Sequence, residues 1–174
     1  MTDVRTTGAV AALARFSDSA FDGQHWHAVM RNLATCTDDD WGWVPPQGER
    51  TIRELVRHIG KCKLMFANQL FGDGTLAWDD PEIDAPARAG GSIDEAIAWL
   101  RETHAVFRDG IAGCTDDQLA TTPDGYWGKP AELQWSIEVM IQHEIYHAGE
   151  INHIRALRQA DDGWGNEPAA EDLA

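Results

Sequence analysis

Two histidines spaced four residues apart, His143 and His147, offer the clearest chemistry in this sequence. Side chains four residues apart lie on the same face of a helix, so both imidazole rings can reach one metal ion. Glu144 lies between them and completes the pattern H-E-x-x-H, in which two histidines bind zinc and the glutamate serves as a general base for peptide hydrolysis. This spacing is typical of a divalent-metal site, and it raises the question of which reaction such a metal would serve.

The residues that follow argue against a zinc peptidase of the metzincin type. That pattern requires a glycine seven residues after the first histidine and a third histidine at ten, whereas Gly149 comes one residue early. In a continuous helix, His153 would lie about 15 Å along the axis from His143 and would be rotated about 120° from His147. We therefore expect His153 to lie outside the metal site, and we do not expect a peptidase.

The composition favours one folded domain, residues 1–174, in a reducing compartment. Hydrophobic residues make up 43% of the chain, which is enough for a sizeable core. The net charge of −15 argues against binding to nucleic acid or to an anionic membrane. The three cysteines are widely spaced and form no C-x-x-C motif, and no apolar run reaches transmembrane or signal-peptide length. We therefore expect a cytoplasmic protein.

The hydrophobic spacing predicts four helical regions and almost no β-strand. Capping boxes mark the start of the second and third regions, where Thr51 precedes Glu54 and Ser92 precedes Glu95. The first region is interrupted near Asp22, which can cap a new helix. The expected helical regions are residues 8–35, 51–71, 92–112 and 132–159. The loops between them, residues 37–50, 73–91 and 114–131, are too long for a minimal up-down bundle.

Helical periodicity turns three histidines toward the interior of such a bundle. His143 and His147 flank an apolar arc on the fourth helix, and His58 lies beside a similar arc on the second. Three imidazoles from two helices would leave coordination positions of a metal open to water or substrate, as in catalytic zinc sites. From the residues alone, buried structural histidines explain His143 and His147 as well as metal binding does, and they explain His58 better.

The segments around these histidines carry a family resemblance. Thr51-Ile-Arg-Glu-Leu-Val-Arg-His58-Ile follows Trp43-Val-Pro-Pro, and 85 residues after His58 the chain reads His143-Glu-Ile-Tyr-His147-Ala-Gly149-Glu150-Ile. These segments resemble the DinB/YfiT-like superfamily, and the N-terminal segment of residues 16–27 resembles one of its branches. The resemblance implies an all-α fold, a DinB-like four-helix bundle of up-down-down-up order with long connecting loops, which frequently forms a homodimer.

Carried over residue by residue, the resemblance makes His58, His143 and His147 the metal ligands. It implies a divalent transition metal, zinc first, with nickel, manganese or iron as alternatives. Glu150 stands where the family more often has glutamine. This carboxylate could orient a ligand ring from behind, and an exposed acidic residue is the alternative. Glu144 could act as a general base, although the helical geometry points it away from His143.

Several other residues are weaker candidates for this site. Cys62 follows His58 by one helical turn and could be a fourth ligand or a redox-sensitive neighbour, and a buried core cysteine is the alternative. His27 could border the pocket, whereas His25 and His104 suit surface or packing positions. The tryptophans in the long loops could wall a pocket, although capping of the core is the simpler explanation.

The resemblance implies two classes of function. Some members of the superfamily transfer or isomerise small-molecule substrates with low-molecular-weight thiols such as mycothiol or bacillithiol, and others are described as metal-dependent hydrolases. The small share of lysine among the basic residues favours mycothiol. The alternative is a metal-binding, stress-associated or accessory protein without turnover. Basic residues at the mouth of the pocket would favour an enzyme for an acidic thiol. We expect that mouth between residues 37–50 and 114–131.

Overall fold

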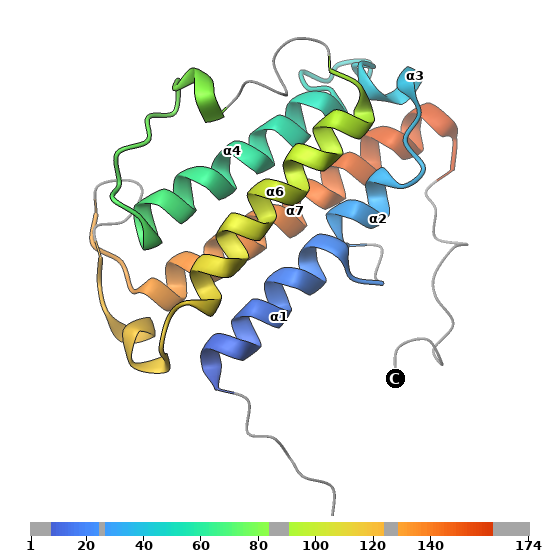
Figure 1. The fold of residues 1–174 in the computed structure, drawn as a ribbon. Coiled ribbons are helices and arrows are strands. Elements are labelled where there is room, and N and C mark those ends of the chain that lie inside the picture. The colour runs from blue at the N-terminus through green and yellow to red at the C-terminus, as the bar shows by residue number, and fades with distance from the viewer. Residues whose placement is uncertain (1–7, 25–26, 84–90, 124–128, 162–174) are drawn as a thin grey trace, which may run out of the picture.

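The computed structural model describes residues 8–24, 27–83, 91–123 and 129–161, and four long helices dominate them (Figure 1). These are α1 (Ala9–Asp22), α4 (Ile52–Phe71), α6 (Ile93–Ala112) and α7 (Leu133–Gln159). Shorter elements are α2 (Val29–Leu33), α3 (Asp38–Trp41) and two 3-10 helices, η1 (Pro81–Ile83) and η2 (Asp116–Ala120). The described residues contain no β-strand, so the expected all-α class is confirmed.

The four long helices have the expected up-down-down-up order. In Figure 1, α1 and α7 run in one direction along the bundle, and α4 and α6 run in the other. Helix α4 packs against both α6 and α7, and α1 covers the other side of the same two helices. Because α4 and α6 are parallel, the chain between them must return along the whole bundle, which accounts for the length of the segment that joins them. None of the described helices is long and apolar enough to cross a membrane.

Capping boxes fix the start of the two central helices. The Thr51 hydroxyl accepts a hydrogen bond from the Glu54 amide at 3.1 Å, and the Glu54 carboxylate accepts one from the Thr51 amide at 2.8 Å. Ser92 and Glu95 form the same pair of bonds at the start of α6. Both boxes were predicted from the sequence. The first box fixes the residue at which α4 begins, and α4 carries His58.

The short helices differ from the sequence-based expectation. Asp22 ends α1 but does not cap a new helix, because the helix resumes only at Val29 and Asp22 instead pairs with Arg101 of α6 at 2.6 Å. Two segments expected to be loops begin short helices with capping boxes of their own. Thr37 with Asp40 starts α3, and Thr115 with Gln118 starts η2.

The apolar core is divided into two clusters along the bundle. One contains Phe21 of α1, Ile59 of α4, Leu100 of α6 and Ala148 of α7, together with their neighbours. The other contains Leu13 of α1, Phe66 of α4, Phe107 of α6 and Ile141 of α7, together with their neighbours. A band of buried polar residues lies between the clusters and draws on all four long helices; its members are Ser17, Lys61, Lys63, Thr103, His104, Glu144 and His147. We call this band the polar layer.

Candidate metal centre

Three imidazole rings converge between α4 and α7. His58 Nε2 lies 2.9 Å from His143 Nε2, and His147 Nε2 lies 3.0 Å from the same atom. The three nitrogen atoms all lie within 4.8 Å of one another, and this is the one such group of potential metal ligands in the described part of the chain. His147 is buried, and the other two rings are half-buried.

The arrangement follows from helix geometry and helix packing. His143 and His147 share one face of α7 because they are one turn apart. Helix α4 lies antiparallel to α7, and this packing brings His58 opposite the pair although it lies 85 residues earlier in the sequence. The sequence-predicted trio is therefore assembled in space.

The electrostatic state of the rings suits metal coordination. Burial and the neighbouring His147, His58 and Lys63 lower the pKa of His143 to about 3. Burial, with His147 and Arg50 next in effect, also lowers the pKa of His58. Both rings are therefore neutral near pH 7, which is the state in which imidazole nitrogen binds a metal.

The spacing of the nitrogen atoms is a second test of fit. Histidine nitrogens lie about 2.0–2.1 Å from a bound zinc ion. Pairs separated by 2.9 and 3.0 Å are within reach of one shared ion. Without an ion, His143 Nε2 has two nitrogen neighbours but carries at most one proton, which can be donated to only one of them. In addition, His143 Nδ1 is buried and has no hydrogen-bond partner among the described residues. The trio therefore fits a divalent metal better than it fits a hydrogen-bonded cluster.

Glu150 sets the orientation of one of these rings. Its carboxylate contacts His147 Nδ1 from the next turn of α7. A proton on Nδ1 is donated to this carboxylate, so the lone pair of His147 lies on Nε2 and faces the other two histidines. The sequence left open whether Glu150 orients a ring or is simply exposed. The structure shows the contact, with about one third of the Glu150 side chain exposed.

We expect Glu150→Ala to weaken metal binding about 10- to 100-fold, the range typical of partners that orient a metal-binding histidine. Glu150→Gln should lose less, because an amide oxygen still accepts the Nδ1 hydrogen bond. The dissociation constant can be measured by competition with a chromophoric chelator. Glu102→Ala, which removes an exposed carboxylate from α6, is the matched control. Equal affinity in Glu150→Ala and wild type would show that the contact does not support the site.

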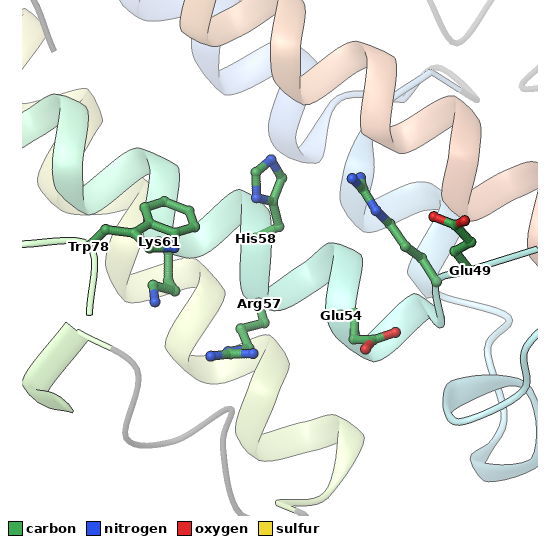
Figure 2. A pocket seen from close by; sticks show the side chains of 7 residues that line it. Glu49, Glu54, Arg57, His58, Lys61 and Trp78 are labelled. Atoms are coloured by element: carbon green, nitrogen blue, oxygen red, sulfur yellow. The ribbon is translucent and has the colours of Figure 1, made fainter. Parts of the chain in front are cut away.

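A pocket of about 370 Å³ lies beside His58 (Figure 2). Four of its lining residues belong to α4, two to the segment before that helix and one to the segment after it; they are Glu49, Arg50, Glu54, Arg57, His58, Lys61 and Trp78. The Trp78 ring meets the His58 ring edge-on with centroids 5.8 Å apart, and Lys61 Nζ lies 4.5 Å from the Trp78 ring centroid. The histidine trio is therefore bordered by a cavity with three basic side chains.

The position of the pocket differs from the expected mouth. Residues 37–50 contribute to it as expected, but the other described flanking residue, Trp78, belongs to 73–91, and no lining residue comes from 114–123 or 129–131, the described parts of the segment expected there. The long return between the parallel helices α4 and α6 carries Trp78 over α4. Arg57 and Lys61 were not recognised in the sequence as pocket residues, whereas Trp78 was among the loop tryptophans for which a pocket wall was one of two expected roles. The recurrence of basic residues every three or four positions from Arg50 to Lys61 was the available signal.

Comparison with protein families gives one clear result. A family model described as the DinB superfamily matches residues 23–151, which is most of the chain and includes all three histidines. The chain belongs to the DinB superfamily. A search of curated proteins found no match. The family assignment agrees with the resemblance carried by the segments around His58 and His143.

In this DinB-superfamily protein, Glu144 lies in the polar layer. Its carboxylate pairs with Lys63 Nζ at 2.9 Å, and the two side chains are 1% and 0% exposed. Lys63 Nζ also lies 3.0 Å from His104 Nδ1, and His104 Nε2 lies 3.1 Å from Asp18 Oδ1. The partner of the Glu144 carboxylate is thus a buried lysine, an arrangement that supports packing between helices more directly than proton transfer at the trio.

The other candidate residues are placed as follows. Cys62 Sγ lies 3.8 Å from His58 Nε2, but burial raises the pKa of this thiol to about 12 and the converging group contains no cysteine. His153 is exposed, as expected. His104 is buried in the polar layer and stacks on Phe21 with ring centroids 4.0 Å apart. His27 is half-buried and does not line the pocket, and His25 lies outside the described residues.

The loop tryptophans of this DinB-superfamily protein divide between the two expected roles. Trp41 is buried in the core cluster near the start of α4, and Trp43 packs against that cluster. Trp78 lines the pocket and is 41% exposed. Trp127 lies outside the described residues. Trp41 and Trp43 therefore cap the core, whereas Trp78 forms part of the pocket wall.

Proposed function

We propose that this protein holds one divalent transition metal on His58, His143 and His147 and uses it to activate a thiol or a water molecule toward a small electrophilic substrate. The observation that carries the proposal is the convergence of three imidazole Nε2 atoms with no carboxylate or thiol in the group. Three neutral ligands leave the full charge of the ion and at least one coordination position available. Zinc is the metal that we propose, because three-histidine sites of this kind suit it.

The proposed chemistry divides between the ion and the protein. A divalent ion with neutral ligands stabilises a thiolate or lowers the pKa of a bound water molecule. The protein holds the ligand rings: Glu150 fixes the proton on His147 Nδ1, and burial keeps His143 neutral. Trp78 covers one side of His58 and limits the access of water there. Cys62 lies near His58 but does not belong to the converging group of ligand atoms.

The lining of the pocket separates an enzyme from a metal-binding protein without turnover. An acidic thiol or another anionic substrate would be attracted to basic groups beside the metal, and an acidic or closed mouth would oppose it. The pocket beside His58 contains Arg50, Arg57 and Lys61. This lining supports an enzyme that acts on an anionic substrate or co-substrate.

The test is a panel of maleyl, epoxide and activated-ester substrates, assayed with and without low-molecular-weight thiols. The rate should disappear on chelation and return when the metal is added back. His58→Ala should abolish it while circular dichroism shows an intact bundle, because most of the packing face of α4 is retained. His153→Ala is the control and should keep the full rate. Bound metal with no metal-dependent rate on any substrate would favour the accessory protein.

A further inference from the structure

We propose that the pocket beside His58 is an anion subsite, in which Arg57 and Lys61, assisted by Arg50, bind the carboxylate or phosphate group of a small organic ligand. The inference rests on the proposed function for the reaction that follows binding. It adds the chemical class of the ligand and the residues that select it. The juxtaposition that carries it is a cluster of cationic side chains and one indole ring around a cavity that borders a converged histidine trio.

The distribution of charge over the chain makes this cluster unusual. The protein has a net charge of −15 and only 14 lysine and arginine residues. Three of them line this pocket. Arg53, Arg57 and Lys61 recur every four residues on α4, and like charges at that spacing repel one another and destabilise a helix. A bound anion would offset this repulsion.

Two acidic residues, Glu49 and Glu54, also line the pocket. The Glu54 carboxylate is used at the start of α4, where it accepts hydrogen bonds from the Thr51 amide at 2.8 Å and from the Thr51 hydroxyl at 3.0 Å. Glu49 is exposed on the segment before the helix. In Figure 2, Lys61 lies with Trp78 on one side of His58, and Glu49 and Glu54 lie on the other. The side toward Trp78 is therefore cationic.

The size of the cavity and its indole wall limit the ligand. A volume of about 370 Å³ is near the lower end of the range of small-molecule pockets. Trp78 offers an apolar surface next to His58, and its ring face holds Lys61 Nζ at 4.5 Å through a cation–π contact. The ligand that fits is a small molecule with one anionic group for the cations and an apolar or planar part for the indole.

Three probes of the same shape test the charge requirement: phenylacetate, phenyl phosphate and the neutral phenylacetamide. Dissociation constants are measured by ligand-observed NMR on chelator-treated and metal-loaded protein. At least one anion should bind about tenfold or more tightly than the amide, because a hydrogen bond to a charged group is lost with the amide. Comparison of the two anions tells a carboxylate subsite from a phosphate subsite.

Variants locate the anion. The double variant Arg57→Gln/Lys61→Gln should reduce the preference for the anion over the amide to about threefold or less, and added salt should weaken binding to wild type. Arg101→Gln removes an exposed arginine paired with Asp22 on another part of the surface and should bind as wild type does. Arg50 lies before α4, and Arg50→Gln should lower the preference for the anion over the amide in part. This variant provides an independent test if the double variant does not fold.

The outcomes distinguish this inference from the proposed function. Equal binding of anion and amide to wild type would overturn the anion subsite. Unchanged anion preference in the double variant would also overturn it. Binding that requires metal and ignores Arg57 and Lys61 would place the anion on the ion, so the subsite would fail while the proposed metal site stood. If the protein takes up no metal but still binds the anion in a charge-dependent way, the anion subsite would stand and the proposed metal site would fail.

Discussion

Replacing His147 with alanine is expected to remove the metal and leave the bundle folded. His147 supplies one of three converging nitrogen atoms, and its Nε2 lies 3.0 Å from that of His143. Loss of a ligand should cost more than loss of the Glu150 contact, so affinity should fall by more than about 100-fold. Elemental analysis after dialysis should find about one transition metal ion per wild-type chain and almost none in His147→Ala.

A matched histidine on the same helix provides the control. His153 is exposed and lies six residues further along α7, so His153→Ala should keep its metal. Its stability should change by no more than about 0.5 kcal/mol, as for other surface substitutions. Equal metal content in His147→Ala and wild type would refute the trio as a metal site. Loss of metal in His153→Ala with an intact fold would bring back the peptidase interpretation.

Removal of Lys63 is expected to cause the largest loss of stability. Lys63 is fully buried, and Lys63→Met would leave the Glu144 carboxylate inside the bundle without its cation. Breaking a buried ion pair in this way costs about 3–5 kcal/mol. Burial raises the pKa of Glu144, so proton uptake by this carboxyl should limit the loss at low pH. The free energy of unfolding can be measured by urea denaturation at pH 7 and pH 5, with the smaller difference from wild type at pH 5.

Two further variants show whether the cost comes from the unpaired charge. Lys63→Met/Glu144→Leu removes both charges and should recover most of the stability, since apolar replacements of a buried pair are often neutral or better. Arg101→Ala breaks an exposed pair with Asp22 and should cost less than about 1 kcal/mol. If the free energy of unfolding of Lys63→Met is within about 1 kcal/mol of the wild-type value, the buried ion pair does not contribute much to the stability of the bundle.

The sequence contained enough information for the main helices because their ends are marked by local chemistry. Thr51 with Glu54 and Ser92 with Glu95 are signals within four residues, and the structure confirms both. Hydrophobic periodicity also indicated which sides of α4 and α7 face inward. The start of α2 was missed, because the segment after Asp22 has no such cap and the helix resumes only where Val29 can pack into the core.

The candidate site was predictable only in part. His143 and His147 are neighbours on one helix, but periodicity cannot place His58 opposite them across 85 residues. The resemblance to a known family supplied that pairing. The ion pair of Lys63 and Glu144 was missed because it depends on the offset between α4 and α7, which no pattern within one helix reports. A pocket wall was one of two roles expected for Trp78, and the sequence could not decide between them because Trp78 reaches α4 through a long return segment.

The polar layer has a consequence for how this bundle chooses its alignment. Contacts between apolar side chains are less directional than ion pairs, so an apolar core distinguishes less sharply between helix offsets that differ by one turn, about 5.4 Å. Here such a slide would press Lys63 or Glu144 against one of the two apolar clusters and separate each from its partner. The polar layer therefore favours one offset between α4 and α7. That same offset brings His58 to His143, so the interactions that select the fold also assemble the histidine trio.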